Sequence, residues 1–190
     1  VTLPHDWAIA GPFYTEPDGE AIVGGGMGRL PVFGVGWYRR KLHISNDDKN
    51  KQIQLELGGA MSYAMVWLNG KLIGGWPYPY NSFQLDLTPH LQFGQDNQIA
   101  IRLDNPVDSA RWYPGGGLYR DVWLTKTEHT HVNQWGTRFT TRDVSDDSAV
   151  IDLQLSLGNT ANYTSKVSVV TEIYRSNTVT GQQGRMAASF

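Results

Sequence analysis

The chain has 190 residues, of which 40% are hydrophobic and 18% charged, with a formal net charge of -2. This length suits one large or two small domains with a packed core. The small net charge excludes bulk electrostatic attraction to nucleic acid or anionic membranes, and no apolar run approaches the roughly 20 residues that span a bilayer. The absence of cysteine excludes disulfides and thiolate metal sites but does not fix the compartment.

Residues 1–35 show no clean periodicity and are rich in glycine and proline, which predicts a long loop or arm. Gly24–Gly28 could alternatively cradle a phosphate. The sequence disfavours that hypothesis, because no strand precedes these glycines and no Lys-Ser/Thr pair follows them. Glu16, Asp18 and Glu20 form a small acidic loop, which we interpret as solvated charge rather than a catalytic pair.

From Gly36 onward, short segments with alternating or β-branched apolar residues predict strands. Asn69-Gly70 separates two of them and predicts a tight hairpin, because both residues tolerate positive φ. Thr88-Pro89 ends another strand, because proline cannot donate to a ladder. The predicted strands in this part are 37–44, 52–57, 65–68, 71–73, 82–87, 99–103 and 120–124.

All seven tryptophans lie between Trp7 and Trp135. This shift in composition predicts a domain boundary between Thr125 and Thr130. Beyond it, alternation predicts one strand over 151–157 followed by a turn at Gly158-Asn159, and a second strand with Val167, Val169 and Ile173 before a turn at Gly181. Because strands recur with turn signals and no amphipathic helix is evident, the sequence predicts an all-β protein built of antiparallel sandwiches.

Few residues have the spacing of a metal or nucleophile site. His129 and His131 would share one face of a strand, but no third ligand is near, so we interpret them as an ordinary strand pair and expect no metal site. The Gly-x-Ser-x-Gly pattern of serine hydrolases is absent.

Two loops are rich in aromatic residues. Trp76–Tyr80 follows the hairpin, and Arg111–Gly117 lies in a later loop. Exposed rings in such loops would suit the flat C–H faces of a sugar, whereas buried aromatic rings usually form core or inter-domain contacts. The sequence leaves both interpretations open.

Several motifs in order resemble the N-terminal domain of glycoside hydrolase family 2, the β-galactosidase and β-glucuronidase family. The opening segment Leu3–Trp7 fits as well, and the resemblance covers residues 1–127. Residues 128–190 resemble the start of the immunoglobulin-like domain that follows in that family. The motifs that carry the resemblance are Trp37–Arg40, Val66–Gly70, Pro79–Phe83 and Arg111–Leu124.

The resemblance implies a jelly-roll, sugar-binding-like β-sandwich over residues 1–127 and a partial immunoglobulin-like β-sandwich over 128–190. It also implies a downstream (β/α)8 barrel with two glutamates for retaining hydrolysis, about 5–5.5 Å apart. Such a barrel needs roughly 250 residues. In the family the acid/base glutamate follows an asparagine, and none of the five glutamates here does: Glu16, Glu20, Glu56, Glu128 and Glu172. We therefore expect the chain to be part of a longer enzyme and to be inactive by itself.

The resemblance also implies that Arg111, Trp112 and Tyr113 form a wall of the substrate pocket or contact the barrel. Some relatives carry an acidic residue at or beside the position of Arg111, where it touches the sugar. The arginine here puts a direct sugar contact in doubt and could instead hold a barrel carboxylate or stack on Trp112.

The sequence thus predicts the non-catalytic N-terminal part of a family 2 retaining exo-β-glycosidase, a β-galactosidase in our interpretation. Its partners would be the barrel of the same polypeptide and a carbohydrate substrate, with no cofactor, nucleic acid or membrane. A free-standing carbohydrate-binding module and a purely structural sandwich pair remain alternatives. Oligomeric state and a periplasmic or cytoplasmic location in a bacterium stay open.

Overall fold

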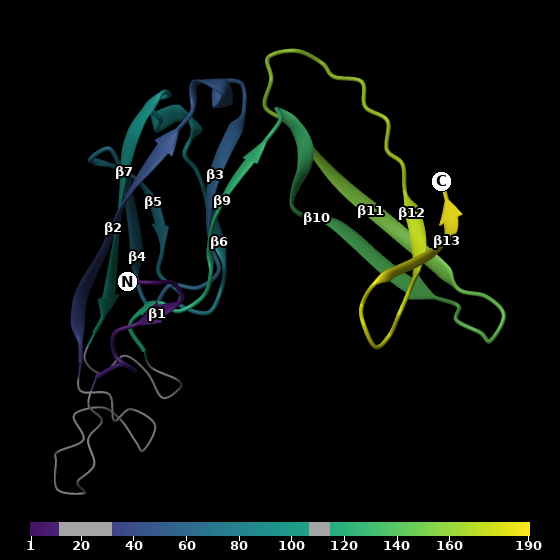
Figure 1. The fold of residues 1–190 in the computed structure, drawn as a ribbon, viewed down its shortest axis with the longest axis horizontal. Coiled ribbons are helices and arrows are strands. Elements are labelled where there is room, and N and C mark those ends of the chain that lie inside the picture. The colour runs from purple at the N-terminus through teal and green to yellow at the C-terminus, as the bar shows by residue number, and fades with distance from the viewer. Residues whose placement is uncertain (12–31, 107–114) are drawn as a thin grey trace, which may run out of the picture.

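The computed structural model describes residues 1–11, 32–106 and 115–190 (Figure 1). Within them nearly all regular structure is β, and the two helices are short 3-10 turns, η1 (Asn46–Asp48) and η2 (Thr88–His90). The predicted all-β class is therefore confirmed. None of the helices in these three ranges is long and apolar enough to cross a membrane.

Seven strands up to Thr127 form two antiparallel sheets. One sheet has the order β2-β7-β4-β5, and the other has the order β6-β3-β9. The predicted antiparallel sandwich is therefore confirmed for this part of the chain. The strands are β2 (Gly34–Ile44), β3 (Gln52–Leu57), β4 (Ala64–Leu68), β5 (Lys71–Trp76), β6 (Phe83–Asp86), β7 (Gln95–Asn105) and β9 (Val122–Thr127).

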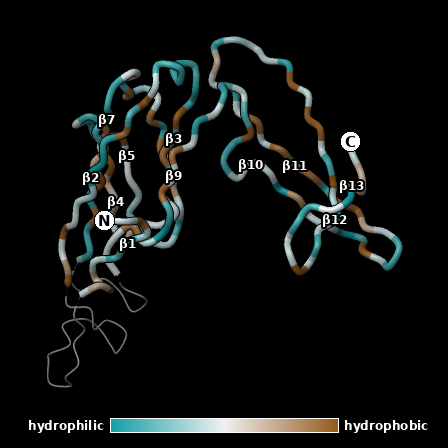
Figure 2. The backbone as a smooth tube through the Cα atoms, in the orientation of Figure 1, coloured by the Kyte–Doolittle hydropathy of each residue, from teal (hydrophilic) through white to brown (hydrophobic). Residues whose placement is uncertain are grey.

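The core lies between these two sheets because each strand alternates apolar and polar residues. Strand β3 buries Ile53, Leu55 and Leu57, and β7 buries every second residue from Asn97 to Asn105. Apolar residues accordingly recur along the strands of the sandwich (Figure 2). The buried rows of the two sheets pack into one cluster, whose members extend from Ile44 to Leu118.

The hairpin predicted at Asn69-Gly70 is present. Leu68 of β4 pairs with Lys71 of β5, and the two turn residues have φ values of 51° and 81°. Positive φ at both central residues is what a two-residue hairpin loop requires. Asn69 also accepts a hydrogen bond from Gln98 N–H through its side-chain oxygen, which ties the turn to β7.

A short strand pair joins the N-terminal residues to the last loop of the sandwich. β1 (His5–Asp6) pairs antiparallel with β8 (Gly117–Leu118), and Met61 forms an isolated bridge to Gly117. Residues 5, 61 and 117 therefore meet at one end of the sandwich. The connection from β9 to the next strand leaves from the opposite end (Figure 1).

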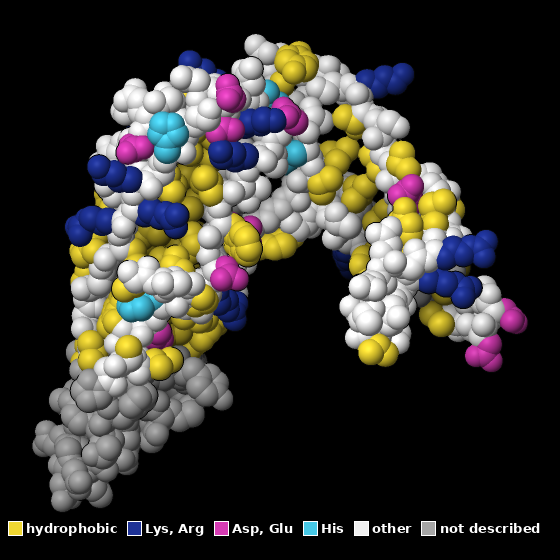
Figure 3. Space-filling model, viewed as in Figure 1, with side chains coloured by type: hydrophobic (Ala, Val, Ile, Leu, Met, Phe, Trp, Pro, Cys, Tyr) yellow, Lys and Arg dark blue, Asp and Glu magenta, His cyan; other side chains and the backbone are white. Residues whose placement is uncertain are grey.

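Residues 128–190 form two separate hairpins with little burial. Among these residues, all of which the structure describes, only Gly136 is buried. Large apolar side chains stay exposed, including Trp135 (71%) and Phe139 (68%), and hydrophobic surface is visible on this part in Figure 3. The strands are β10 (Thr130–Arg142), β11 (Val150–Asn159), β12 (Glu172–Ser176) and β13 (Gln183–Ser189).

Two local predictions in this part are wrong. Gly158-Asn159 is not a turn: both residues end β11, because β10 is long enough to pair with them through His131 and Thr130. Val167 and Val169 are outside any strand, because no described strand lies beside them, and β12 begins only at Glu172. The turn at Gly181 is present, with φ of 68° and its N–H bonded to Asn177 C=O.

Candidate functional site

The residues predicted to contact a sugar or barrel, Arg111, Trp112 and Tyr113, lie outside the described residues. Glu16, Glu20 and the Gly24–Gly28 segment also lie outside them. The structure does describe Gly115–Leu118, which begin two positions after Tyr113, and the residues that hold this segment in place. The candidate site is therefore built from the anchor of the Arg111 loop, at the end of the sandwich that carries β1 and β8.

The carboxylate of Asp6 is the centre of this anchor. Its Oδ1 accepts hydrogen bonds from three backbone N–H groups, those of Ala8 (2.8 Å), Ile9 (3.0 Å) and Gly116 (3.0 Å). The N–H of Trp7 donates to the carbonyl of Gly116 at 2.7 Å. Hydrogen bonds to a charged acceptor are among the stronger ones in proteins. Asp6 therefore ties the N-terminal segment to the end of the Arg111 loop.

The three consecutive glycines are required by close packing against this segment. A Cβ atom on Gly115 would lie 2.4 Å from Asp6 Oδ2, and one on Gly116 would lie 2.5 Å from the Trp7 ring. At Gly117, whose φ is 145°, a Cβ atom would lie 2.2 Å from the His5 carbonyl. At these three positions the surface that leaves no room for a side chain is formed by the chain's own residues 5–7.

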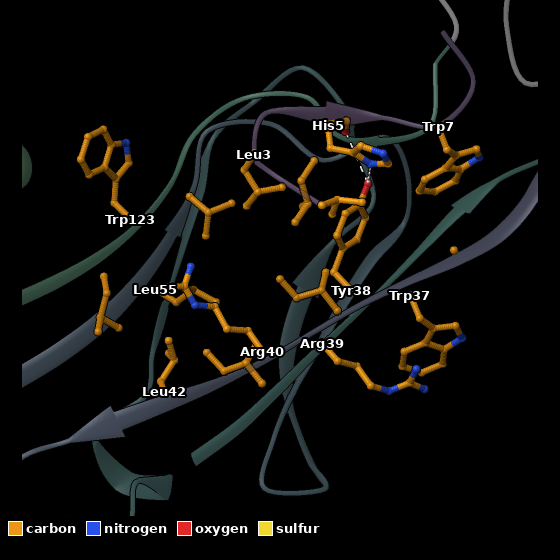
Figure 4. A pocket seen from close by; sticks show the side chains of 17 residues that line it. Leu3, His5, Trp7, Trp37, Tyr38, Arg39, Arg40, Leu42, Leu55 and Trp123 are labelled. Atoms are coloured by element: carbon orange, nitrogen blue, oxygen red, sulfur yellow. Dashed lines mark hydrogen bonds between the residues drawn. The ribbon is translucent and has the colours of Figure 1, made fainter. Parts of the chain in front are cut away.

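Tyr38 of β2 supports the anchor from inside the sandwich. Its hydroxyl forms a 2.7 Å hydrogen bond with Nδ1 of His5, and the two rings meet edge to face (Figure 4). Burial raises the pKa of the Tyr38 hydroxyl above its ordinary value. The His5 backbone in turn pairs with Leu118. Tyr38 thus links the β1–β8 pair to the four-stranded sheet.

A second loop, residues 76–83, lies at the same end and carries exposed aromatic rings. Trp76 stacks on Phe83 and remains 41% exposed, while Tyr78 packs against Tyr80 and is 49% exposed. Neither ring is core, and neither is fully free. The sequence left open whether these rings are core or ligand contacts, and the structure shows each ring in contact with another aromatic ring and partly exposed.

The 76–83 loop is held to the Arg111 loop by Tyr119. The Tyr119 hydroxyl donates a 2.7 Å hydrogen bond to the carbonyl of Pro79, and burial raises its pKa above the ordinary value. Gly59 accommodates the Tyr119 ring, because a Cβ atom there would lie 2.6 Å from it. The guanidinium of Arg120 lies over the same ring, 5.2 Å from its centroid, which is within the roughly 6 Å of a cation–π contact.

The three glutamates that the structure describes lie in different parts of the fold. Glu56 lies on the outward face of β3, Glu128 pairs with Lys51, and Glu172 accepts a hydrogen bond from Tyr174. Within the described ranges no three His, Cys, Asp or Glu side chains form a group that could hold a metal ion. His129 and His131 bond separately to Thr160 and to the carbonyl of Glu128.

Sequence reasoning treated His5 and Asp6 only as part of a matching motif and assigned them no role. The signal that could have identified their role was the run of glycines at 115–117, which needs a crowded neighbour. Its partner could not be located from local pattern, because Asp6 and Gly116 are 110 positions apart in the chain.

Comparison with known proteins gives consistent results. Residues 35–141 match the family model of the glycosyl hydrolase 2 galactose-binding domain-like family. A β-galactosidase of Bacteroides ovatus, BoGH2A, is 41% identical over 175 residues, covering 91% of this chain and 20% of that protein. A putative β-glucuronidase of Formosa agariphila is 33% identical over 174 residues, covering 88% of this chain and 19% of that protein.

Solved structures agree with these relatives. A β-glycosidase from Bacteroides vulgatus superposes with a TM-score of 0.74 and 34% identity, covering 86% of this chain and 21% of that one. A glycosyl hydrolase family 2 member from Bacteroides cellulosilyticus gives a TM-score of 0.78 at 29% identity and covers 98% of this chain. The chain spans about a fifth of the length of the curated relatives cited.

Proposed function

The chain belongs to the glycosyl hydrolase 2 galactose-binding domain-like family, and from that premise we propose that it is the non-catalytic N-terminal part of a retaining exo-β-glycosidase, a β-galactosidase. In this proposal residues 1–127 and 128–190 are two separate domains. The first braces the catalytic barrel of the same polypeptide and forms part of the wall of its sugar pocket. The β-galactosidase assignment is supported by the 41% identity to the Bacteroides ovatus enzyme over 91% of the chain.

The bracing role is carried by one observation, the attachment of Gly115–Leu118 to residues 5–7. The segment after Tyr113 has its backbone bonded to Trp7, Asp6 and Met61, so the loop has a firm base. A pocket wall must hold its side chains in place to orient a sugar, because small misplacements near a reacting centre are costly in rate. A loop with this base meets that need, and Arg111, Trp112 and Tyr113 are its proposed contact residues.

The exposed rings of Trp76 and Tyr78 at the same end support a partner there. Exposed aromatic groups clustered at one end of a domain are typical of surfaces that meet another protein or a ligand. Hydrolysis itself would come from the barrel, because retaining enzymes need two carboxyl groups about 5–5.5 Å apart across the glycosidic bond. This chain would affect the reaction only by helping to position the sugar in the pocket.

The test compares the complete parent protein with the isolated chain of residues 1–190. Both are assayed against nitrophenyl β-galactoside and nitrophenyl β-glucuronide at equal molar concentration. We expect the parent to hydrolyse the galactoside and the chain to hydrolyse neither. Hydrolysis of only the glucuronide by the parent would overturn the substrate assignment. Turnover by the chain that survives repurification, or sugar binding by a parent without any barrel, would favour a different function.

A further inference from the structure

A hollow of about 730 Å³ opens at one edge of the sandwich, between β2 and β9 (Figure 4). Its walls are the side chains that point inward from these two strands, including Tyr38, Leu42, Val122 and Leu124, and Leu55 forms part of its floor. Protein interiors are close-packed and hold few voids larger than a water molecule. A space of this size between core-facing aliphatic side chains indicates that another element belongs there.

The order of the strands in the two sheets indicates that the missing element is a β-strand. At the opposite edge of the sandwich β6 lies against β5, with Leu85 packed on Gly74. Counting from that edge, β3 and β9 lie opposite β4 and β7, and the three-stranded sheet has no strand among the described residues that lies opposite β2. A fourth strand beside β9 would face β2 and fill the hollow.

The edge of β9 is free to accept such a strand. Gly58 N–H donates to Asp121 C=O at the end of the β3–β9 ladder, and hydrogen-bonded pairs alternate along an antiparallel ladder. The backbone groups of Trp123 and Thr125 therefore face β3, whereas those of Val122 and Leu124 face away from it. No strand of the described residues lies beyond β9 on that side.

Arg40 indicates which chemical groups the strand that fills the hollow must carry. It lies on the inward face of β2, between Tyr38 and Leu42, and points into the hollow in Figure 4. It forms no ion pair with any described residue. An occupant that covers this guanidinium must supply a carboxylate or carbonyl oxygens, because an unpaired charge is costly to bury.

We propose that this hollow binds a β-strand that adds to the free edge of β9, and that the residues directly preceding Val1 in the parent polypeptide supply it. Val1 and Leu3 line the hollow, so polypeptide attached to the amino group of Val1 leaves directly from it. The relatives are about five times longer than this chain, so parent proteins of their size have residues to spare. The strand would alternate apolar side chains over Leu55 and Ile101 with an oxygen ligand for Arg40.

A sugar fits the hollow less well than a strand. Apart from three tryptophans, which each offer one indole N–H, only four of its lining residues carry polar side-chain groups: His5, Tyr38, Arg39 and Arg40. Of these, His5 and Tyr38 already bond to each other. A sugar needs hydrogen-bonding partners for most of its hydroxyls, because polar groups buried without them are costly. An extended peptide instead meets its backbone needs at the β9 edge.

The test measures amide exchange in the chain of residues 1–190 with and without the roughly 15 parent residues that precede Val1, enough to include a strand as long as β9. With the natural extension we expect the exchange of Val122 and Leu124 N–H to slow by roughly tenfold or more. Trp123 and Thr125, already bonded to β3, should change little. A Gly/Ser extension of equal length is the control and should protect neither pair. Unchanged exchange at Val122 and Leu124 with the natural extension overturns the proposal.

A matched pair of charge reversals tests the role of Arg40. Arg40→Glu places a carboxylate inside the hollow, and Lys41→Glu makes the same change on the outer face of the same strand. Both side chains are exposed in the isolated chain, so folding should survive. In the extended protein we expect Arg40→Glu to abolish the new protection and Lys41→Glu to retain it. Equal effects of the two reversals would overturn the placement of the strand against Arg40.

The occupant's source is tested by oligomeric state. Light scattering of the extended protein should show a monomer in which Val122 and Leu124 are protected. Protection that requires a concentration-dependent dimer, and that persists in the chain without the extension, would assign the edge to a second copy and contradict the proposal. None of these measurements uses enzyme activity, so failure here is distinguishable from failure of the proposed function.

Discussion

The backbone N–H of Gly116 donates a 3.0 Å hydrogen bond to Oδ1 of Asp6, across 110 positions of the chain. The same oxygen accepts from Ala8 and Ile9, so one carboxylate both shapes the turn after β1 and holds the base of the Arg111 loop. The described base of this loop, Gly115–Leu118, is therefore held by a residue that is far from it in the sequence.

Asp6→Ala should destabilise the isolated chain by about 1–3 kcal/mol, because three backbone N–H groups lose their acceptor at once. Asp6→Asn keeps an oxygen that can accept these bonds and should cost clearly less. The measurement is urea unfolding followed by tryptophan fluorescence. Equal midpoints for the two variants would mean that the hydrogen bonds to Oδ1 do not hold this end of the sandwich together.

Gly116→Ala should also destabilise the chain, by about 1–3 kcal/mol, because the new methyl group would overlap the Trp7 ring. A smaller residue at position 7 should relieve that overlap, so Gly116→Ala should cost less in a Trp7→Leu background. A double-mutant cycle by chemical denaturation measures the difference. Additive effects of the two substitutions would show that the ring is not what excludes a side chain at Gly116.

The stability of the chain should fall at alkaline pH partly through Tyr38. Burial raises the folded-state pKa of Tyr38, so as pH rises above about 10 the unfolded chain releases this proton first. The stabilisation is complete below that pH and is lost as pH rises through the folded-state pKa. Tyr38→Phe should flatten the decline in unfolding free energy between pH 9 and pH 11, a range set by the ordinary tyrosine pKa of about 10. Tyr163→Phe, at an exposed site, is the control and should leave this decline unchanged. A decline in Tyr38→Phe as steep as in the unsubstituted chain would contradict the assignment.

Amide exchange should divide the chain into a protected and an unprotected part. Strands β3, β4 and β7 lie in a packed core, whereas Gly136 is the only buried residue of 128–190. Segments with few buried contacts open at low free energy. We expect peptides from β10 to β13 to exchange faster than those from β3, β4 and β7 in hydrogen-exchange mass spectrometry. Uniform protection in a strict monomer would show that residues 128–190 have a core of their own.

Trp112→Ala should separate pocket contact from core packing. In the parent enzyme we expect a lower kcat/KM for nitrophenyl β-galactoside, because the pocket wall would no longer orient the sugar. In the isolated chain the same substitution should change stability by only about 0.5 kcal/mol, as surface substitutions do. Tyr163→Ala in the parent is the control and should leave kcat/KM unchanged. Unfolding of the chain by Trp112→Ala would identify Trp112 as a core residue.

Much of the candidate site could not be predicted from sequence. The motif Leu3–Trp7 and the glycines 115–117 were both noticed, but nothing in local pattern shows that they touch. Arg111, Trp112 and Tyr113 lie outside the described residues, so their role remains a prediction that rests on the family resemblance and on the base that Asp6 provides.

The sequence by itself determined the class of fold, the strands of the sandwich, the hairpin at Asn69-Gly70 and the family. These features depend on local alternation, on residues that tolerate positive φ and on the order of short motifs. Only the tertiary structure decided which strands pair, because pairing depends on contacts between distant segments. It placed Gly158-Asn159 inside β11 opposite Thr130 and His131, left Val167 without a neighbouring strand, and put Arg40 beside a hollow that β2 and β9 form together.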